Sequence, residues 1–168
     1  MTHPRLGILN LMGDAYSLIA TQDEAALASF FLSSAVGTST PPPCDVLLLY
    51  CDFSEDGRIV GASSGLREII RDSNAHIVIV ASANPAQRYA AATRPAGYGE
   101  ANLVFTIDRR GPSFALFYRR LFELMSTGVS MPVAWVKLAP QAPGAAHEDA
   151  PDSIFAIEVG QIDFGPEV

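Results

Sequence analysis

The stretch Val46–Tyr50 (VLLLY) decides the fold class, because an unbroken apolar run of this length predicts a strand covered on both faces. His76–Ala81 (HIVIVA) is a second such run and is rich in β-branched residues. Between the two runs, Ser63 or Ser64 is expected to cap an amphipathic helix. A buried strand, a helix and another buried strand in this order predict a parallel sheet covered by helices.

Towards the N-terminus, the apolar run Leu6–Met12 predicts another buried strand. Thr21 and Glu24 have the spacing of a capping box, which predicts a helix over the apolar run Ala25–Leu32. The next tract, Ser33–Pro43, is rich in Ser, Thr, Gly and Pro and is predicted to be a loop.

Towards the C-terminus, the sequence predicts three helices, one strand and a terminal hairpin. Asn84-Pro85 starts one helix, while Pro112 opens the longest, which ends at Gly128. The remaining elements are a strand at Asn102–Ile107, a helix at Met131–Leu138 capped by Ser130, and two short strands at Ile154–Val159 and Ile162–Phe164.

Strands and helices therefore alternate four times before a final helix and hairpin. This order predicts an α/β three-layer sandwich around a mainly parallel sheet, with the hairpin at one edge. We expect Val46–Tyr50 and Ile77–Val80 to be fully buried. Residues 1–168 are expected to form one domain, since domains typically have roughly 100–200 residues.

Composition and charge exclude several classes of protein. Of the 168 residues, 49% are hydrophobic and 17% are charged, which excludes a disordered, collagen-like or coiled-coil chain. The net charge of −7 predicts no nucleic-acid binding, which needs a basic patch. No apolar run approaches the roughly 20 residues that cross a bilayer, and no signal peptide is visible, so we expect no membrane contact and a cytoplasmic location. Cys44 and Cys51 lack the spacing of a zinc site and are expected to be reduced thiols.

Candidate functional residues lie where the predicted strands end. Ligands of an open parallel sheet bind beyond the carboxyl ends of its strands, here called the carboxyl edge. The candidate ligand-binding residues at this edge are Asp14, Cys51, Asp52, Ser82, Asn84, Asp108, Arg109 and Arg110.

Cys51 and Ser82 are the candidate nucleophiles of the carboxyl edge, but either needs a base, normally a histidine. His76 begins the strand that Ser82 follows, so about 20 Å separates the two. His147 lies in a late loop that the sequence does not place. We therefore predict no catalytic residue, and expect Cys51 to pack as a small apolar residue and Ser82 to help cap the next helix. A position of His147 within about 4 Å of either side chain would restore hydrolase chemistry.

The carboxyl edge also contains residue types suited to a cation site and to an anion site. Asp14, Asp52 and Asp108 would form a divalent-cation site if they met, but we expect them to be solvated loop residues, with no metal and no cofactor. The stretches Gly61–Gly65 and Arg109–Gly111 each precede a helix and offer backbone N–H groups to an anion. Neither matches a nucleotide-binding motif.

The segment Asn102–Ala139 resembles the closing segment of CHAT-type caspase-like domains. In that family, a strand leads to a helix with an FY-x-x-L pattern, then a glycine turn and a short helix with a small residue. Phe117–Leu121 and Gly128–Trp135 occupy the matching places, and Asp45–Ala83 is compatible with the centre of the same fold. The resemblance covers about two-thirds of the chain and implies a caspase-like version of the three-layer sandwich, related in architecture to flavodoxin-like folds.

The peptidases of this family carry a histidine after the strand that matches Val46–Tyr50 and a cysteine after the strand that matches Ile77–Ala81. Here those corners hold Cys51 and Ala81/Ser82. The resemblance therefore implies a caspase-like scaffold without the His–Cys dyad of a peptidase.

Two functions from different classes follow from these observations. The first is a non-enzymatic caspase-like module that binds a protein partner, or a second copy of itself, in a bacterial regulatory system. The alternative is an enzyme that handles a small molecule or phosphate with Asp14, Asp52, Asp108, Arg109 and Arg110.

Self-association is expected from the aromatic residues of the C-terminal third. Tyr118, Phe122 and Trp135 fall outside the stripe that the longest helix buries, and the terminal hairpin would offer a free sheet edge. The alternative is that these aromatic side chains are core residues beneath the C-terminal segment. The residues of the buried stripe are Phe114, Phe117, Leu121, Leu124 and Met125.

Overall fold

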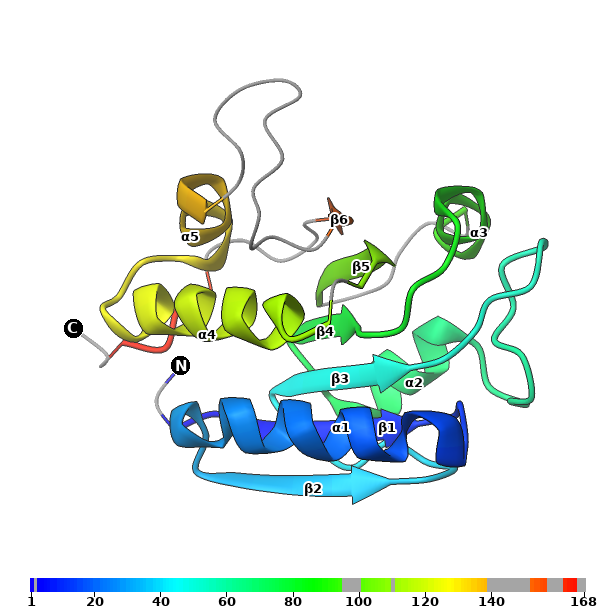
Figure 1. Ribbon diagram of the computed structural model, residues 1–168, viewed down its shortest axis with the longest axis horizontal. Coiled ribbons are helices and arrows are strands. Elements are labelled where there is room, and N and C mark those ends of the chain that lie inside the picture. The colour runs from blue at the N-terminus through cyan, green and yellow to red at the C-terminus, as the bar shows by residue number, and fades with distance from the viewer. Residues whose placement is uncertain (2, 95–100, 110, 139–151, 157–161, 166–168) are drawn as a thin grey trace.

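The computed structural model describes residues 1, 3–94, 101–109, 111–138, 152–156 and 162–165 (Figure 1). Its centre is a six-stranded sheet with the order β2-β1-β3-β4-β5-β6. The first five strands are parallel, and β6 runs antiparallel to β5. The strands are β1 Arg5–Asn10, β2 Ser33–Gly37, β3 Val46–Tyr50, β4 Ile77–Val80, β5 Asn102–Asp108 and β6 Asp152–Ala156.

Helices cover both faces of the sheet, which confirms the α/β three-layer sandwich. One face packs against α1, α4 and α5, and the other against α2 and α3. The runs Val46–Tyr50 and Ile77–Val80 are at most 1% exposed, as predicted, because both of their faces are covered. The helices are α1 Asp14–Leu27, α2 Leu66–Ser73, α3 Ala86–Ala92, α4 Ser113–Ser126 and α5 Met131–Leu138, with a short 3-10 turn, η1, at Ala28–Phe30.

The strand order creates a crevice at the carboxyl edge. The parallel strands follow the order 2-1-3-4-5, in which the connections after β1 and β3 leave towards opposite faces. On one of those faces α1 and α4 lie side by side (Figure 1). None of the helices in the described part of the chain is long and apolar enough to cross a membrane.

The first helix begins earlier than its sequence pattern predicts. Thr21 is not an N-cap but lies inside α1, where its hydroxyl donates a hydrogen bond to the carbonyl oxygen of Ser17 at 3.0 Å. This bond to a preceding carbonyl is the usual way in which a helix accommodates threonine, so a threonine followed by glutamate need not mark a helix start. The helix starts after Gly13, whose φ of 64° favours glycine.

The tract predicted as a loop contains β2, so that part of the prediction is wrong. Ser33 to Gly37 pair in parallel with Arg5 to Leu9 of β1. Every residue of β2 is at least partly exposed, because the strand lies at the edge of the sheet. An edge strand with exposed side chains does not need an apolar run. The Ser and Gly content of β2 is therefore also typical of a loop, which is why the sequence predicted one.

Helix caps are shifted by one or two residues from their predicted places. Gly65, rather than Ser63 or Ser64, is the N-cap of α2, and its N–H donates to the Glu68 carboxylate at 2.8 Å. Pro85 directly precedes α3 instead of opening it. Shifts of this size leave the predicted helices themselves in place.

The C-terminal segment does not form the predicted hairpin. β6 pairs with β5, but Ile162 and Phe164 bond to the helical layer instead of to β6. The Met131 N–H donates to the Ile162 carbonyl at 2.7 Å, and the Phe164 N–H donates to the Met125 carbonyl at 3.0 Å. Both apolar side chains are 8% exposed, so burial against the helices replaces pairing with a strand.

The same packing decides between the two interpretations of the aromatic residues. Tyr118 and Phe122 are fully buried, and the Phe122 ring lies 5.2 Å from that of Phe164. Trp135 packs edge-on against Phe117 at 4.9 Å. These side chains belong to the core under the C-terminal segment, so the interface expected from Tyr118 and Phe122 is not present on the surface.

Candidate functional site

Three of the predicted site residues, Cys51, Ser82 and Asn84, meet in a buried hydrogen-bond network. The Ser82 hydroxyl accepts the Cys51 N–H at 2.9 Å and donates to the Cys51 carbonyl at 2.6 Å. The Asn84 amide accepts the Phe53 N–H at 2.9 Å and donates to the same Cys51 carbonyl at 3.0 Å. The Tyr89 hydroxyl lies 2.8 Å from the Ser82 carbonyl. The network therefore links the turn after β3 to the turn after β4. The expectation that Ser82 helps to cap α3 is wrong, because its hydroxyl is bonded to the Cys51 backbone instead.

The Cys51 thiol is fully buried and packs among the apolar residues between the sheet and α2–α3. Burial, with a smaller contribution from the Asp52 carboxylate, raises the pKa of this thiol far above its usual range. Burial likewise raises the pKa of Cys44 to about 12. Since the thiolate is the nucleophile, neither cysteine is prepared for covalent catalysis. His147, whose position would test this further, lies outside the described residues, as does Arg110.

The native protein is expected to resist thiol labelling. An aromatic disulfide reagent at about pH 8 should modify Cys44 and Cys51 at least a hundredfold more slowly in the native chain than in urea, because labelling requires opening of the core. A Leu18→Cys variant is the control, since Leu18 is 68% exposed and its replacement should react at once. Rapid modification of Cys51 in the native chain would contradict its assignment as a packing residue.

The candidate acids stay apart. Among the described residues, no three His, Cys, Asp or Glu side chains gather closely enough to hold a metal ion. Asp14 is exposed at the start of α1 and lines a cavity of about 500 Å³ between the turns that follow β1, β2 and β3. Gly61–Ser64 line the same cavity. Asp14 and Asp72 are its charged lining residues and both are acidic, so this stretch does not favour an anion.

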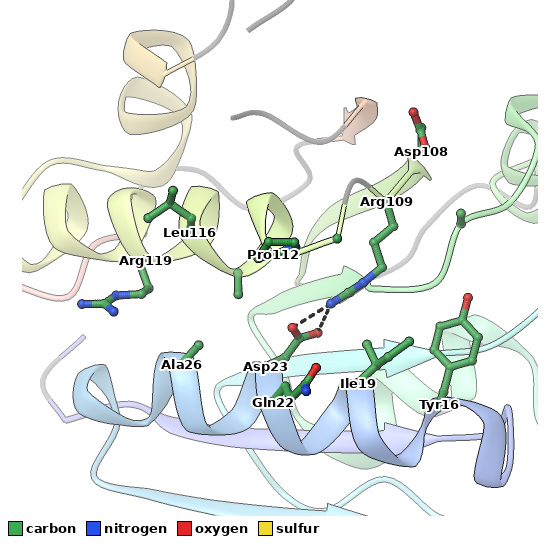
Figure 2. A pocket seen from close by; sticks show the side chains of 13 residues that line it. Tyr16, Ile19, Gln22, Asp23, Ala26, Asp108, Arg109, Pro112, Leu116 and Arg119 are labelled. Carbon is green, nitrogen blue, oxygen red and sulfur yellow. Dashed lines mark hydrogen bonds and ion pairs between the residues drawn. The ribbon is translucent and has the colours of Figure 1, made fainter. Parts of the chain in front are cut away.

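A cavity of about 790 Å³ lies between α1 and α4 at the carboxyl edge and is here called the α1–α4 pocket (Figure 2). Its walls are mainly apolar, and its charged lining residues are Asp23, Asp108, Arg109 and Arg119. Asp108 and Arg119 are exposed, whereas Asp23 and Arg109 are at most 11% exposed and form the base. Apolar side chains on the walls come from Tyr16, Ile19, Ala26, Pro112, Ala115 and Leu116.

A buried ion pair forms the base of the pocket. Both carboxylate oxygens of Asp23 lie 2.7 Å from Nη2 of Arg109, and the Tyr50 hydroxyl donates to Asp23 at 2.6 Å. Arg109 Nη1 donates to the Ala81 carbonyl at 3.0 Å, and the guanidinium stacks 4.0 Å above the Phe114 ring. Each charge is thus compensated, which is the condition for burying it.

The buried surroundings of the pair also affect the hydroxyl of Tyr50. Burial, followed in size by the Asp23 carboxylate, raises the pKa of Tyr50, so its hydroxyl remains a hydrogen-bond donor. Arg109 was predicted from its place after a strand, but Asp23 was not. A lone aspartate in the middle of a helix carries no sequence signal of burial, and its partner is 86 residues away.

Comparison with known proteins assigns the chain to no family. A scan against models of protein families finds no match to the chain, and a search of curated proteins finds none either. The function of the chain is therefore inferred from its own geometry.

Proposed function

We propose that this chain is a non-catalytic, caspase-like binding module whose α1–α4 pocket receives a segment of a partner protein. One observation carries the proposal. At the corners where peptidases of the resembled family hold their dyad, Cys51 and Ser82 are fully buried, and Ser82 is bonded to backbone. The α1–α4 pocket of the same edge is lined by neither residue, and its base is a compensated ion pair.

The shape of the pocket fits an apolar anchor. Its volume of about 790 Å³ falls within the range of specific ligand sites, and Ile19, Ala26 and Leu116 supply apolar wall. Leu116 is 40% exposed, so a ligand that covers it gains hydrophobic stabilisation. A side chain such as leucine or phenylalanine from a partner segment would occupy part of this space.

The charge at the mouth of the pocket favours an acidic neighbour beside that anchor. Arg119 is exposed and forms no ion pair with any residue that the structure describes. A carboxylate next to the apolar anchor would pair with this guanidinium, preferably in a bidentate manner. The proposed ligand is therefore a peptide segment with one large apolar residue flanked by Asp or Glu.

Selection from a random peptide library tests the proposal. We expect the wild-type chain to enrich peptides with an apolar residue beside an acidic one, and to cleave none of them. Ala115→Trp places an indole ring in the pocket and should weaken binding at least about tenfold, and Arg119→Glu should act mainly on the acidic peptides. Val133→Trp is the matched control, since Val133 is 47% exposed on α5 and does not line the pocket. Equal binding by Ala115→Trp and the control would refute the pocket as the binding site.

A second candidate is an enzyme that acts on a small molecule at the carboxyl edge through Asp14, Asp52, Asp108, Arg109 and Arg110. The observation that favours it is the cavity that Asp14 lines between the turns after β1, β2 and β3, because ligands of such sheets bind beyond the strand ends. Asp108 and Arg109 line the α1–α4 pocket instead. A thermal-shift screen with nucleotides, phosphates and divalent ions distinguishes the two functions, because a ligand of the native state raises its melting temperature. A reproducible shift that Ser64→Trp abolishes would favour this second function.

A further inference from the structure

The edge strand β2 is open to pairing with another strand. It is the first strand of the sheet order, and among the strands that the structure describes it pairs only with β1. Two of the most exposed large apolar side chains in the described chain, Leu32 at 69% and Val36 at 58%, lie on or beside it. Natural sheet edges are normally protected by charged residues, proline or a bulge. β2 has none of these within Ser33–Gly37.

Hydrogen bonds of β1 show which backbone groups of β2 point outward. The Asp45 N–H donates to the Arg5 carbonyl at 3.0 Å, so Arg5 faces β3. Because backbone groups alternate along a strand, Leu6 and Ile8 face β2. The register pairs Gly7 with Ala35, which directs the ladder bonds of Ala35 towards β1. The N–H and C=O groups of Ser34 and Val36 therefore point away from the sheet.

We propose that two copies of this chain pair antiparallel through β2, about a two-fold axis at Ala35. In this register Ser34 of each copy faces Val36 of the other, and the two outward-pointing residues exchange four N–H···O bonds across the interface. If the two-fold axis passed through Ser34 or Val36 instead, only the residue on the axis would pair with the same residue of the second copy. The register at Ala35 therefore uses both outward-pointing residues of β2, and the two sheets become continuous.

Side chains on the α1 side of the strand support the same pairing. The Ser34 hydroxyl donates to Glu24 of α1, which places Leu32, Ser34 and Val36 on that side. In the two-fold pairing, Val36 lies diagonal to both Leu32 and Val36 of the second copy, within reach of cross-strand packing. The pairing therefore covers these exposed apolar side chains in one continuous strip. This favours a second copy of the chain as the partner of the β2 edge.

Charge favours the same contact. Each chain has a net charge of −7, yet residues 31–43 contain no charged residue. Pairing through β2 therefore brings together no charged side chain of this stretch, although Glu24 of α1, bonded to Ser34, lies beside the strand in each copy. Added salt should strengthen the pairing by screening this and the remaining charge. A five-residue edge buries less than the roughly 1,000 Å² of a stable interface, so the dimer is a weak one. This inference does not depend on the α1–α4 pocket.

Sedimentation of the full chain between about 10 μM and 1 mM tests the association. We expect the mass to rise from 17.9 kDa towards twice that value, more so at higher salt. Val36→Lys should remain at the monomer mass, whereas Val133→Lys, the same change on α5, should behave as wild type. A mass that stays at 17.9 kDa throughout, or a dimer that persists in Val36→Lys, overturns the proposal.

Cysteine cross-linking tests the register and does not rely on a destabilising variant. In the proposed pairing the two Ala35 Cα atoms are about 4.5 Å apart, within disulfide range, while the two Ser33 Cα atoms are more than about 12 Å apart. Ala35→Cys should therefore oxidise to a covalent dimer at least tenfold faster than Ser33→Cys. The native Cys44 and Cys51 are fully buried and contribute no background. Equal oxidation rates of the two variants overturn the register.

Discussion

Replacing Asp23 by alanine is expected to lower the free energy of unfolding by about 3–5 kcal/mol. The substitution leaves the Arg109 guanidinium, whose side chain is 11% exposed, without its carboxylate. It also removes the acceptor of the Tyr50 hydroxyl, so a second buried polar group loses its partner. Urea denaturation of the variant and the wild type measures the difference directly.

Two further variants show whether burial of the pair causes this loss. Asp56→Ala breaks the exposed Arg58–Asp56 pair, whose side chains are 86% and 61% exposed, and should leave the free energy of unfolding nearly unchanged. The double variant Asp23→Leu/Arg109→Met removes both buried charges and should be more stable than Asp23→Ala alone, because no buried charge is left unpaired. If Asp23→Ala lowers the free energy of unfolding no more than Asp56→Ala does, the buried ion pair does not stabilise the base of the pocket.

Phe122→Ala is expected to cost about 3–5 kcal/mol of folding free energy. The ring is fully buried and contacts Phe31 at 5.5 Å and Phe164 at 5.2 Å, so its removal leaves a cavity where three parts of the chain meet. Because Phe164 packs on this ring, limited proteolysis should also cut the C-terminal segment sooner. Leu116→Ala on the same helix is the control, since Leu116 is 40% exposed and should cost less than about 1 kcal/mol.

A loss below 1 kcal/mol for Phe122→Ala, or unchanged proteolysis of the C-terminal segment, would contradict the packing of Ile162 and Phe164 on the helical layer. Urea denaturation and a proteolysis time course therefore test two different consequences of one contact. The first measures the cavity, and the second measures the attachment of the segment.

The buried strands were predictable because covering a strand on both faces forces its sequence to be apolar without interruption. Val46–Tyr50 and Ile77–Val80 show this signal and lie where it places them. β2 could not be recognised in the same way, because a strand at the edge with exposed side chains is free to be Ser- and Gly-rich. The start of α1 was missed because that helix fully buries only Ala20, Asp23 and Leu27, which makes its apolar stripe weak.

The candidate site was predictable only in part, for a similar reason. Position after a strand is visible in a sequence, so Arg109 and the corner of Cys51, Ser82 and Asn84 were found. Their roles depend on contacts between distant segments, and these have no local signal. Asp23 is the clearest example, because its burial against Arg109 arises from the meeting of α1 with the turn after β5.

The base of the α1–α4 pocket is electrically neutral but strongly dipolar. Asp23 presents its negative end from α1 and Arg109 its positive end from the turn after β5, and low exposure keeps water from screening the field between them. A charged or polar group of a ligand placed against this pair, such as a peptide amide, would be stabilised in one orientation and destabilised in the opposite one. Under the proposed function, the base of the pocket would therefore select the orientation of the partner segment, while Arg119 at the mouth would select its charge.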